Sequence, residues 1–207
     1  MPKRARKPVD PARRVIEHTL RLAAERGWYR VGLADIAAAA KLSLAELYRL
    51  YPSRAAILTA FVRSIDEAVL AKGEAEGATA RERLFDLLMR RFEALRPHKE
   101  GLAAILTACR GDPFALLCGG LRLKRSLAWT LEAAGLASHG LLGRARLKGL
   151  ALVYLATLRV WLQDDSPDLS RTMAALDRQL GRAEALAGLC RRFGGRVKGG
   201  AEAPEAA

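Results

Sequence analysis

Apolar residues recur along most of the chain at the three- and four-residue spacing that places them on one face of an α-helix. No segment alternates apolar and polar residues between turn signals, as a half-buried strand does. Capping residues mark where the helices begin and end. Asp10 and Pro11 begin a first helix, which ends at Gly27. A short second helix follows near residues 33–39, and Ser43 begins the third. The pattern therefore predicts an all-α protein.

Polar breaks divide the predicted helices into two domains. Pro52 and Ser53 end the third helix and cap a fourth that runs from 54 to about 72, where the polar segment 73–77 follows. We expect a three-helix head at 10–55 and a larger helical bundle at 56–198, linked by this fourth helix. Residues 1–9 are expected to form a flexible basic arm and residues 199–207 a disordered tail.

The larger domain opens with a capping box formed by Thr79 and Glu82, and Pro97 ends the helix that follows. The later helices are predicted at about 98–109, 112–134, 138–163 and 168–185, followed by a short amphipathic helix near 186–193. Ser138 and Asp168 are the expected starts of the last two long helices.

Residues 33–49 have the layout of a helix-turn-helix, with two short helices joined by a tight turn and a serine opening the second. The side chains that would pack the two helices together are Ile36, Ala37, Leu42 and Leu47.

The run LYRLYPSRAAIL, residues 47–58, resembles the link between the recognition helix and the fourth helix of TetR-family transcriptional regulators, roughly L-Y-x-H-F-x-S/N-K-x-x-L. The matching positions are Leu47, Tyr48, Ser53, Arg54 and Leu58. With Asp35-Ile36-Ala37 and Trp28-Tyr29 included, the resemblance covers residues 12–62. It implies that Tyr48 and Arg54 touch phosphates and that residues 43–49 face base edges. Tyr48 has the alternative of holding the turn as a core-edge aromatic, and Arg49 can reach either guanine or the backbone.

Several positions depart from that family pattern. Lys41 stands where the family usually has a turn glycine, and Leu50 replaces the common histidine. Leu44, Ala45 and Glu46 replace the usual polar or small residues of the recognition helix. Glu46 repels phosphate although it can accept from cytosine N4, and Leu44 offers a thymine-methyl contact at most. Phosphate binding therefore follows from the sequence, whereas base reading does not.

A second resemblance lies at residues 161–169, WLQDDSPDL, with Thr172, Leu176 and Asp177 downstream. This segment is similar to the C-terminal part of the lipid-binding accessory proteins of ubiquinone biosynthesis, which implies a TetR-like fold that dimerises through its last helices. The alternative is an unrelated acidic turn in which Asp165 or Ser166 caps the next helix.

Residues 149–162 are apolar nearly all round, which indicates burial on more than one side. We expect a homodimer in which helices 139–164 and 168–186 form a four-helix interface. The interface residues would be Leu150, Val153, Leu158, Leu169, Thr172 and Leu176. Large aromatics of the same domain are either core or the lining of an apolar effector cavity; they are Phe92, Phe114, Trp129, Tyr154 and Trp161.

The chain of 207 residues has a net charge of +13, and residues 1–54 hold 12 of the 35 basic but only 5 of the 22 acidic residues. The concentration near the N-terminus is either a solubilising tail or an arm that lies against phosphate. The candidate DNA-binding residues are Lys3, Arg4, Arg6, Lys7, Ser43, Leu44, Ala45, Glu46, Tyr48, Arg49 and Arg54.

No Ser-His-Asp or Cys-His arrangement and no phosphate-cradling glycine loop occurs, so we expect no enzyme, cofactor or metal site. Three widely spaced cysteines fit a reducing cytosol. The longest uncharged run has 11 residues against about 20 for a membrane span, and no export signal opens the chain. We therefore expect a cytoplasmic protein without a transmembrane segment.

Two functions fit these observations. The first is a dimeric transcriptional regulator, a repressor that binds a double-stranded DNA operator and is released by a small apolar or lipid-like effector. The alternative is a lipid- or isoprenoid-binding accessory protein of quinone biosynthesis with a degenerate helix-turn-helix.

Overall fold

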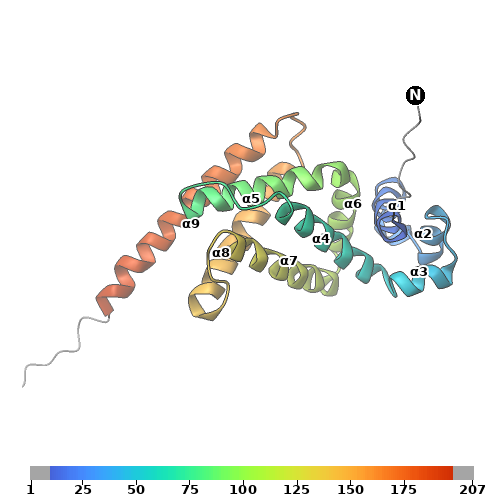
Figure 1. Cartoon of the computed structure of the whole chain (residues 1–207), viewed down its shortest axis with the longest axis horizontal. Coiled ribbons are helices and arrows are strands. Elements are labelled where there is room, and N and C mark those ends of the chain that lie inside the picture. Colours follow the sequence, from blue (N-terminus) through green and yellow to red (C-terminus); the bar gives the residue numbers. More distant parts are fainter. Residues whose placement is uncertain (1–9, 198–207) are drawn as a thin grey trace, which may run out of the picture. The chain divides into compact units, whose positions relative to one another are not determined.

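The computed structural model describes residues 10–197, with side chains for residues 10–188 (Figure 1). Within that range the chain forms helices and turns and no strand, which confirms the all-α prediction. The elements are α1 (Pro11–Arg26), η1 (Trp28–Arg30), α2 (Leu33–Ala39), α3 (Leu44–Leu50), α4 (Arg54–Leu70), α5 (Ala80–Leu95), η2 (Arg96–His98), α6 (Lys99–Cys109), α7 (Pro113–Ala133), α8 (Gly140–Trp161) and α9 (Ser170–Val197). The predicted basic arm, with Lys3, Arg4, Arg6 and Lys7, and the predicted tail at 199–207 lie outside the described residues.

The helices begin where the sequence places caps. Asp10 accepts from the Ala12 N–H at 3.1 Å, Ser53 accepts from the Ala56 N–H at 3.1 Å, and Thr79 forms the predicted capping box with Glu82. These side chains satisfy amide groups that have no partner within the first helical turn.

Three helix limits differ from the prediction, and one of them is the start of α9, which begins at Ser170 rather than directly after Asp168. His139, not Ser138, precedes α8, because the Ser138 N–H donates instead to the carboxylate of Glu132 at 2.8 Å. The expected break near residue 185 does not occur, since α9 continues to Val197 as one helix.

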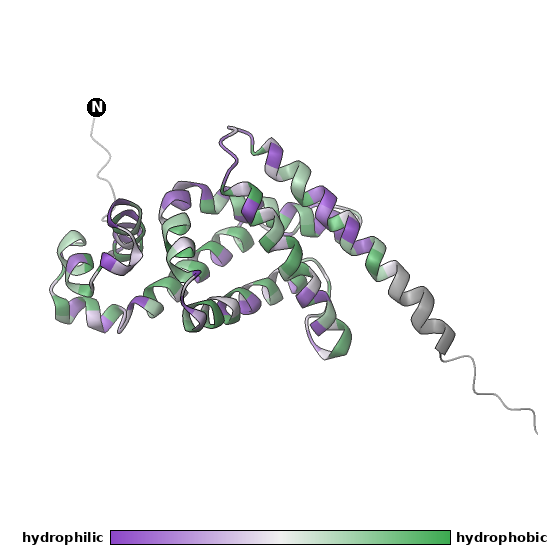
Figure 2. Cartoon of the chain, turned by 180° about the vertical axis from the view of Figure 1, so that it is seen from behind, coloured by the Kyte–Doolittle hydropathy of each residue, from purple (hydrophilic) through white to green (hydrophobic). Residues whose placement is uncertain are grey.

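Chain contacts separate the protein into two compact units. The first contains α1 to α4, the end of α5 from Arg90, α6, and α7 as far as Trp129. The second contains α5 from its start to Met89, the last residues of α7, α8 and α9. Figure 2 shows apolar and polar residues alternating around the helices, which is the pattern that buries one face of each.

The core of the first unit holds the apolar faces of α1 and α4, including Val15, Leu20, Ile57 and Phe61. A close approach in this unit joins α1 to α6 at Gly101. A Cβ at that position would lie 2.4 Å from the carbonyl oxygen of Leu20, so only glycine lets the two backbones meet.

The second unit is built on the packing of α8 against α9. All six residues predicted for the dimer interface are buried here within the single chain: Leu150, Val153 and Leu158 on α8, and Leu169, Thr172 and Leu176 around α9. These side chains already fill the core between the chain's own helices and have little surface left for a partner, and their place in a dimer interface stays a prediction. The face of α8 left exposed is a different one.

Candidate DNA-binding surface and effector domain

The turn between α2 and α3 closes with paired backbone hydrogen bonds. The Leu42 N–H donates to the Ala37 carbonyl at 2.9 Å and the Lys41 N–H to the Ala38 carbonyl at 3.1 Å. This Schellman geometry places Lys41 at φ 56°, in the left-handed region that favours glycine. Ile36 and Leu47 are fully buried beneath the turn, as the sequence predicted.

Glu46 belongs to the start of α3 rather than to its reading face. Its carboxylate accepts from the N–H and the hydroxyl of Ser43, both at 2.7 Å, and the Glu46 N–H donates to the Ser43 hydroxyl at 3.2 Å. Hydrogen bonds from the backbone N–H and then the hydroxyl of Ser43 lower the pKa of Glu46. The side chains of Ser43 and Glu46 thus form a capping box with each other. The Glu46 carboxylate stays ionised near any bound phosphate.

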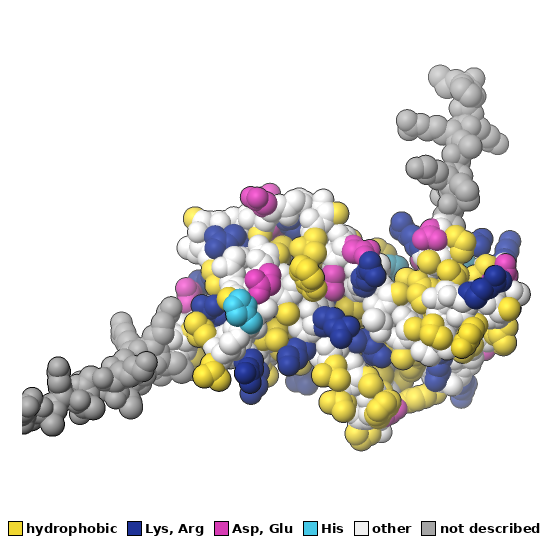
Figure 3. All heavy atoms as spheres, turned by 60° about the horizontal axis from the view of Figure 1, so that its bottom comes forward, with side chains coloured by type: hydrophobic (Ala, Val, Ile, Leu, Met, Phe, Trp, Pro, Cys, Tyr) yellow, Lys and Arg dark blue, Asp and Glu magenta, His cyan; other side chains and the backbone are white. Residues whose placement is uncertain are grey.

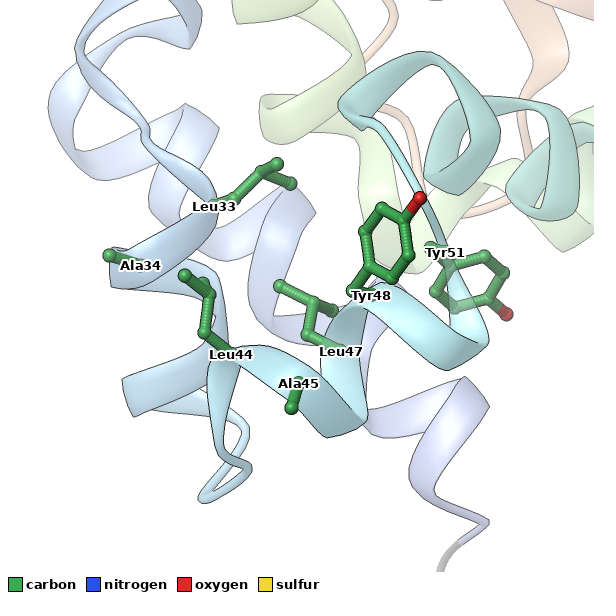
Figure 4. A pocket seen from close by; sticks show the side chains of 7 residues that line it. All are labelled: Leu33, Ala34, Leu44, Ala45, Leu47, Tyr48 and Tyr51. Atoms are coloured by element: carbon green, nitrogen blue, oxygen red, sulfur yellow. The ribbon is translucent and has the colours of Figure 1, made fainter.

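The exposed face of α3 is largely apolar. Leu44 is 57% exposed and Tyr48 is 67% exposed, and Ala45 lies beside them. They border an open hollow of about 380 Å³ between α2 and α3 (Figure 4). Its lining consists of Leu33, Ala34, Leu44, Ala45, Leu47, Tyr48 and Tyr51. In Figure 4 Leu44 points from α3 toward Leu33 on α2, and the two tyrosine rings mark the other end.

Cationic groups surround this apolar face. Arg49 is exposed on α3, with its Nε donating to the Ala45 carbonyl at 3.4 Å, and Lys41 is exposed on the preceding turn. Figure 3 shows apolar side chains on the N-terminal end of the molecule with Lys and Arg at their margins. A surface of this kind suits an anionic partner that also offers apolar groups.

Arg54 has an internal role that sequence reasoning missed. Its Nη1 donates to the carbonyls of Trp28 at 3.0 Å and Val31 at 2.9 Å, and its guanidinium lies 4.8 Å from the centre of the Trp28 ring. Arg54 therefore fixes the segment between α1 and α2 onto the start of α4. Its predicted phosphate contact remains a prediction for the donors that these bonds leave.

The five aromatics predicted to line an effector cavity do not share one environment. Phe92 is fully buried in the first unit, while Tyr154 and Trp161 are buried in the second. Phe114 and Trp129 are 74% and 61% exposed on α7, so neither lines an enclosed cavity of the single chain. These two aromatics lie on the outward side of α7, whose Leu127 and Leu131 are buried, so their place in an effector site stays a prediction.

Helix α8 also carries an exposed apolar face. Leu141 is 83% exposed, Leu152 71% and Leu155 49%, and their spacing places them on one side of the helix. Sequence reasoning did not separate this side from the buried one, because the segment is apolar nearly all round.

Residues 15–61 match the family described as bacterial regulatory proteins, tetR family, and residues 145–187 match COQ9. A TetR transcriptional regulator from Nitrosomonas europaea is 25% identical, with a TM-score of 0.68 over 84% of this chain and 98% of its own. The chain has the fold of a TetR-family regulator. Both resemblances predicted from the sequence are thereby confirmed.

Two further TetR structures share this fold. A regulator from Rhodococcus sp. RHA1 is 22% identical, with a TM-score of 0.60 over 84% of this chain and 94% of its own. A regulator from Streptomyces coelicolor is 18% identical, with a TM-score of 0.58 over 88% of this chain and 82% of its own. Comparison with curated protein sequences finds no match.

The described part of the chain was expected to hold neither a membrane span nor a metal site. None of its helices combines the length and apolar character of a membrane span. No group of three or more His, Cys, Asp or Glu side chains within it is placed to hold a metal ion.

Proposed function

We propose that the protein is a dimeric transcriptional regulator, a repressor that binds operator DNA through two copies of the head and is released by a small apolar effector. The observation that carries this proposal is the exposed face of α3, held by its capping box beside the exposed cations Lys41 and Arg49. The match of residues 15–61 to the tetR family supports the same assignment.

In this proposal each part of the chain has one task. The head at 10–55 binds DNA, the arm at 1–9 adds phosphate contacts, and the domain at 56–198 dimerises and binds the effector. Tyr154 and Trp161, both buried in the second unit, remain candidate lining of an effector site, whereas Phe92 is buried in the first unit. The three cysteines in the sequence suit a cytoplasmic location, where thiols stay reduced.

Dimerisation is proposed through the exposed side of α8, around Leu152 and Leu155. A large exposed apolar patch marks an interaction surface, and a two-fold axis lets two heads reach major grooves about 34–36 Å apart. An effector that alters this separation weakens operator binding.

DNA binding is tested by fluorescence anisotropy on the gene's own upstream region and on random duplex of equal length, over a salt series. We expect tighter binding to the upstream DNA and a loss of at least about fivefold in Arg49→Ala, which is the low end for a base contact of about 1 kcal/mol. Arg178→Ala is the matched control, because it removes the same charge from an exposed position on α9. Equal affinity for both DNAs at every salt concentration refutes the regulator assignment.

The interface is tested by light scattering after size exclusion. Leu152→Glu is expected to give a folded monomer, whereas Leu121→Glu, at a 59% exposed position on α7, is expected to leave the dimer intact. A dimer that survives Leu152→Glu, or that dissociates only in Leu121→Glu, places the interface elsewhere.

The match of residues 145–187 to COQ9 favours a second candidate, a lipid- or isoprenoid-binding accessory protein of quinone biosynthesis. Mass spectrometry of organic extracts from the purified protein tests it. A bound isoprenoid together with no preference for upstream DNA supports this second function, and an extract free of isoprenoids and lipids argues against it.

A further inference from the structure

The recognition helix offers few polar groups to a base pair. The side-chain oxygens of Ser43 and Glu46 form hydrogen bonds with each other and with the backbone N–H groups at the start of α3. Leu44 and Ala45 carry no polar side-chain atom. Of residues 43–49 only Tyr48 and Arg49 combine an exposed side chain with polar groups outside the capping box.

The surface beside these residues is an apolar hollow lined by leucine, alanine and tyrosine from α2 and α3 (Figure 4). In the major groove the thymine 5-methyl is the one apolar group on a base edge, whereas every other feature is a donor or an acceptor. A polar edge held against this hollow would lose its water without gaining a partner, which is unfavourable. A methyl group gains by the same burial.

We propose that this protein reads its operator chiefly through pyrimidine 5-methyl groups, which Leu44, Ala45 and Tyr48 receive at the hollow between α2 and α3. This inference rests on the proposed DNA-binding function and names the base feature that gives it specificity. The hollow, about 380 Å³, is much larger than the roughly 30 Å³ that one water molecule occupies in the liquid, so it has room for more than one methyl-sized group from neighbouring pyrimidines.

The proposal predicts that 5-methylcytosine presents the same methyl group as thymine at the contacted positions. The two bases carry the methyl group at the same ring carbon and differ in the exocyclic group at C4. Cytosine methylation at a contacted step should therefore strengthen binding rather than block it.

The test uses the full-length protein and a duplex selected from a random library for tightest binding. Affinity is measured with thymine replaced by uracil one position at a time, which removes only the methyl group. We expect uracil at one or more positions to weaken binding about fourfold each, the effect of one buried methyl group. Replacing such a thymine by cytosine and then by 5-methylcytosine should lose and then partly restore affinity.

Variants assign the effect to the hollow. Leu44→Ala keeps a good helix former at an exposed position and should abolish the difference between thymine and uracil. Arg49→Ala should weaken binding yet keep that difference. Two results would refute this inference and leave the proposed DNA-binding function standing. In the first, no thymine-to-uracil replacement changes the affinity although base-pair changes do. In the second, Leu44→Ala keeps the full difference in affinity between thymine and uracil. If selection yields no sequence above random DNA, both the inference and the proposed function fall.

Discussion

Replacing Asp164 by asparagine should strongly destabilise the packing of α9 against α8. Asp164 is 2% exposed and follows directly after α8. One carboxylate oxygen accepts from the N–H and hydroxyl of Ser166, and the other accepts from the Thr172 N–H at 2.8 Å and hydroxyl at 2.6 Å. An asparagine turns an NH₂ group toward one of these pairs, so the backbone N–H of that pair loses its acceptor and the hydroxyl must turn to accept instead of donate.

The magnitude follows from the pKa of this carboxyl. Burial alone would raise it, but hydrogen bonds from Ser166 and Thr172 hold the pKa of Asp164 at about 2, below the ordinary 3.8. That shift corresponds to about 2 kcal/mol of stability at neutral pH. Leaving buried donors unpaired costs about 1 kcal/mol or more in addition. We expect Asp164→Asn to lose about 3 kcal/mol.

The same shift sets the pH dependence. Because the folded pKa lies below the unfolded one, the stabilisation by Asp164 is complete above about pH 4 and is lost as the pH falls toward 2. At pH 3 the gap between wild type and Asp164→Asn should be narrower by about 1 kcal/mol.

Urea unfolding followed by circular dichroism at pH 7 and pH 3 measures both effects. Asp177→Asn is the control, since its carboxylate pairs with Arg81 at 2.7 Å on the exposed surface and should contribute less than about 1 kcal/mol. A loss in Asp164→Asn no larger than in the control, or a gap that is equal at both pH values, refutes the reasoning.

Three other substitutions test local features of the fold and the site. Lys41→Gly should raise stability by about 1 kcal/mol in thermal unfolding, because glycine relieves the φ of 56°; a lower melting temperature contradicts this. Gly101→Ala should lower the free energy of unfolding by about 3 kcal/mol, because the new Cβ clashes with Leu20. Gly120→Ala is the control and should be neutral or stabilising, since the space around its Cβ is open. Equal effects of the two substitutions would show that the close approach at Gly101 is unimportant. Glu46→Gln should keep the capping box and bind random DNA several-fold more tightly at low salt, and an unchanged affinity would place this carboxylate away from phosphate.

Local signals were sufficient for the helix starts and for the helix-turn-helix. A cap such as Ser43 acts within one turn, so neighbouring residues in the sequence determine it. The contacts of Arg54 with the Trp28 and Val31 carbonyls join residues more than twenty positions apart, and no local pattern encodes them. The buried carboxylate after α8 is Asp164, whereas the sequence pointed to Asp165 or Ser166 as the cap.

Which side of a helix is covered was the harder question. Residues 149–162 are apolar nearly all round, so hydrophobicity alone did not separate Leu150, which is buried within the chain, from Leu152, which is exposed. The same problem affected α7, where Phe114 and Trp129 were expected inside. Tertiary packing decides such faces, and a single sequence carries little information on it.

The division of the two units along the chain has a consequence for synthesis on the ribosome. The first unit needs α6, which ends at Cys109, to cover α1, so the head emerges well before its partner helix. At about 5–20 residues per second, the 35 residues between Glu74 and Cys109 keep Leu20 and its neighbours exposed for roughly 2–7 seconds. The start of α5 waits longer, since it belongs to a unit completed only by α8 and α9. Nascent chains of this protein therefore pass through a period in which an apolar surface is open to chaperones.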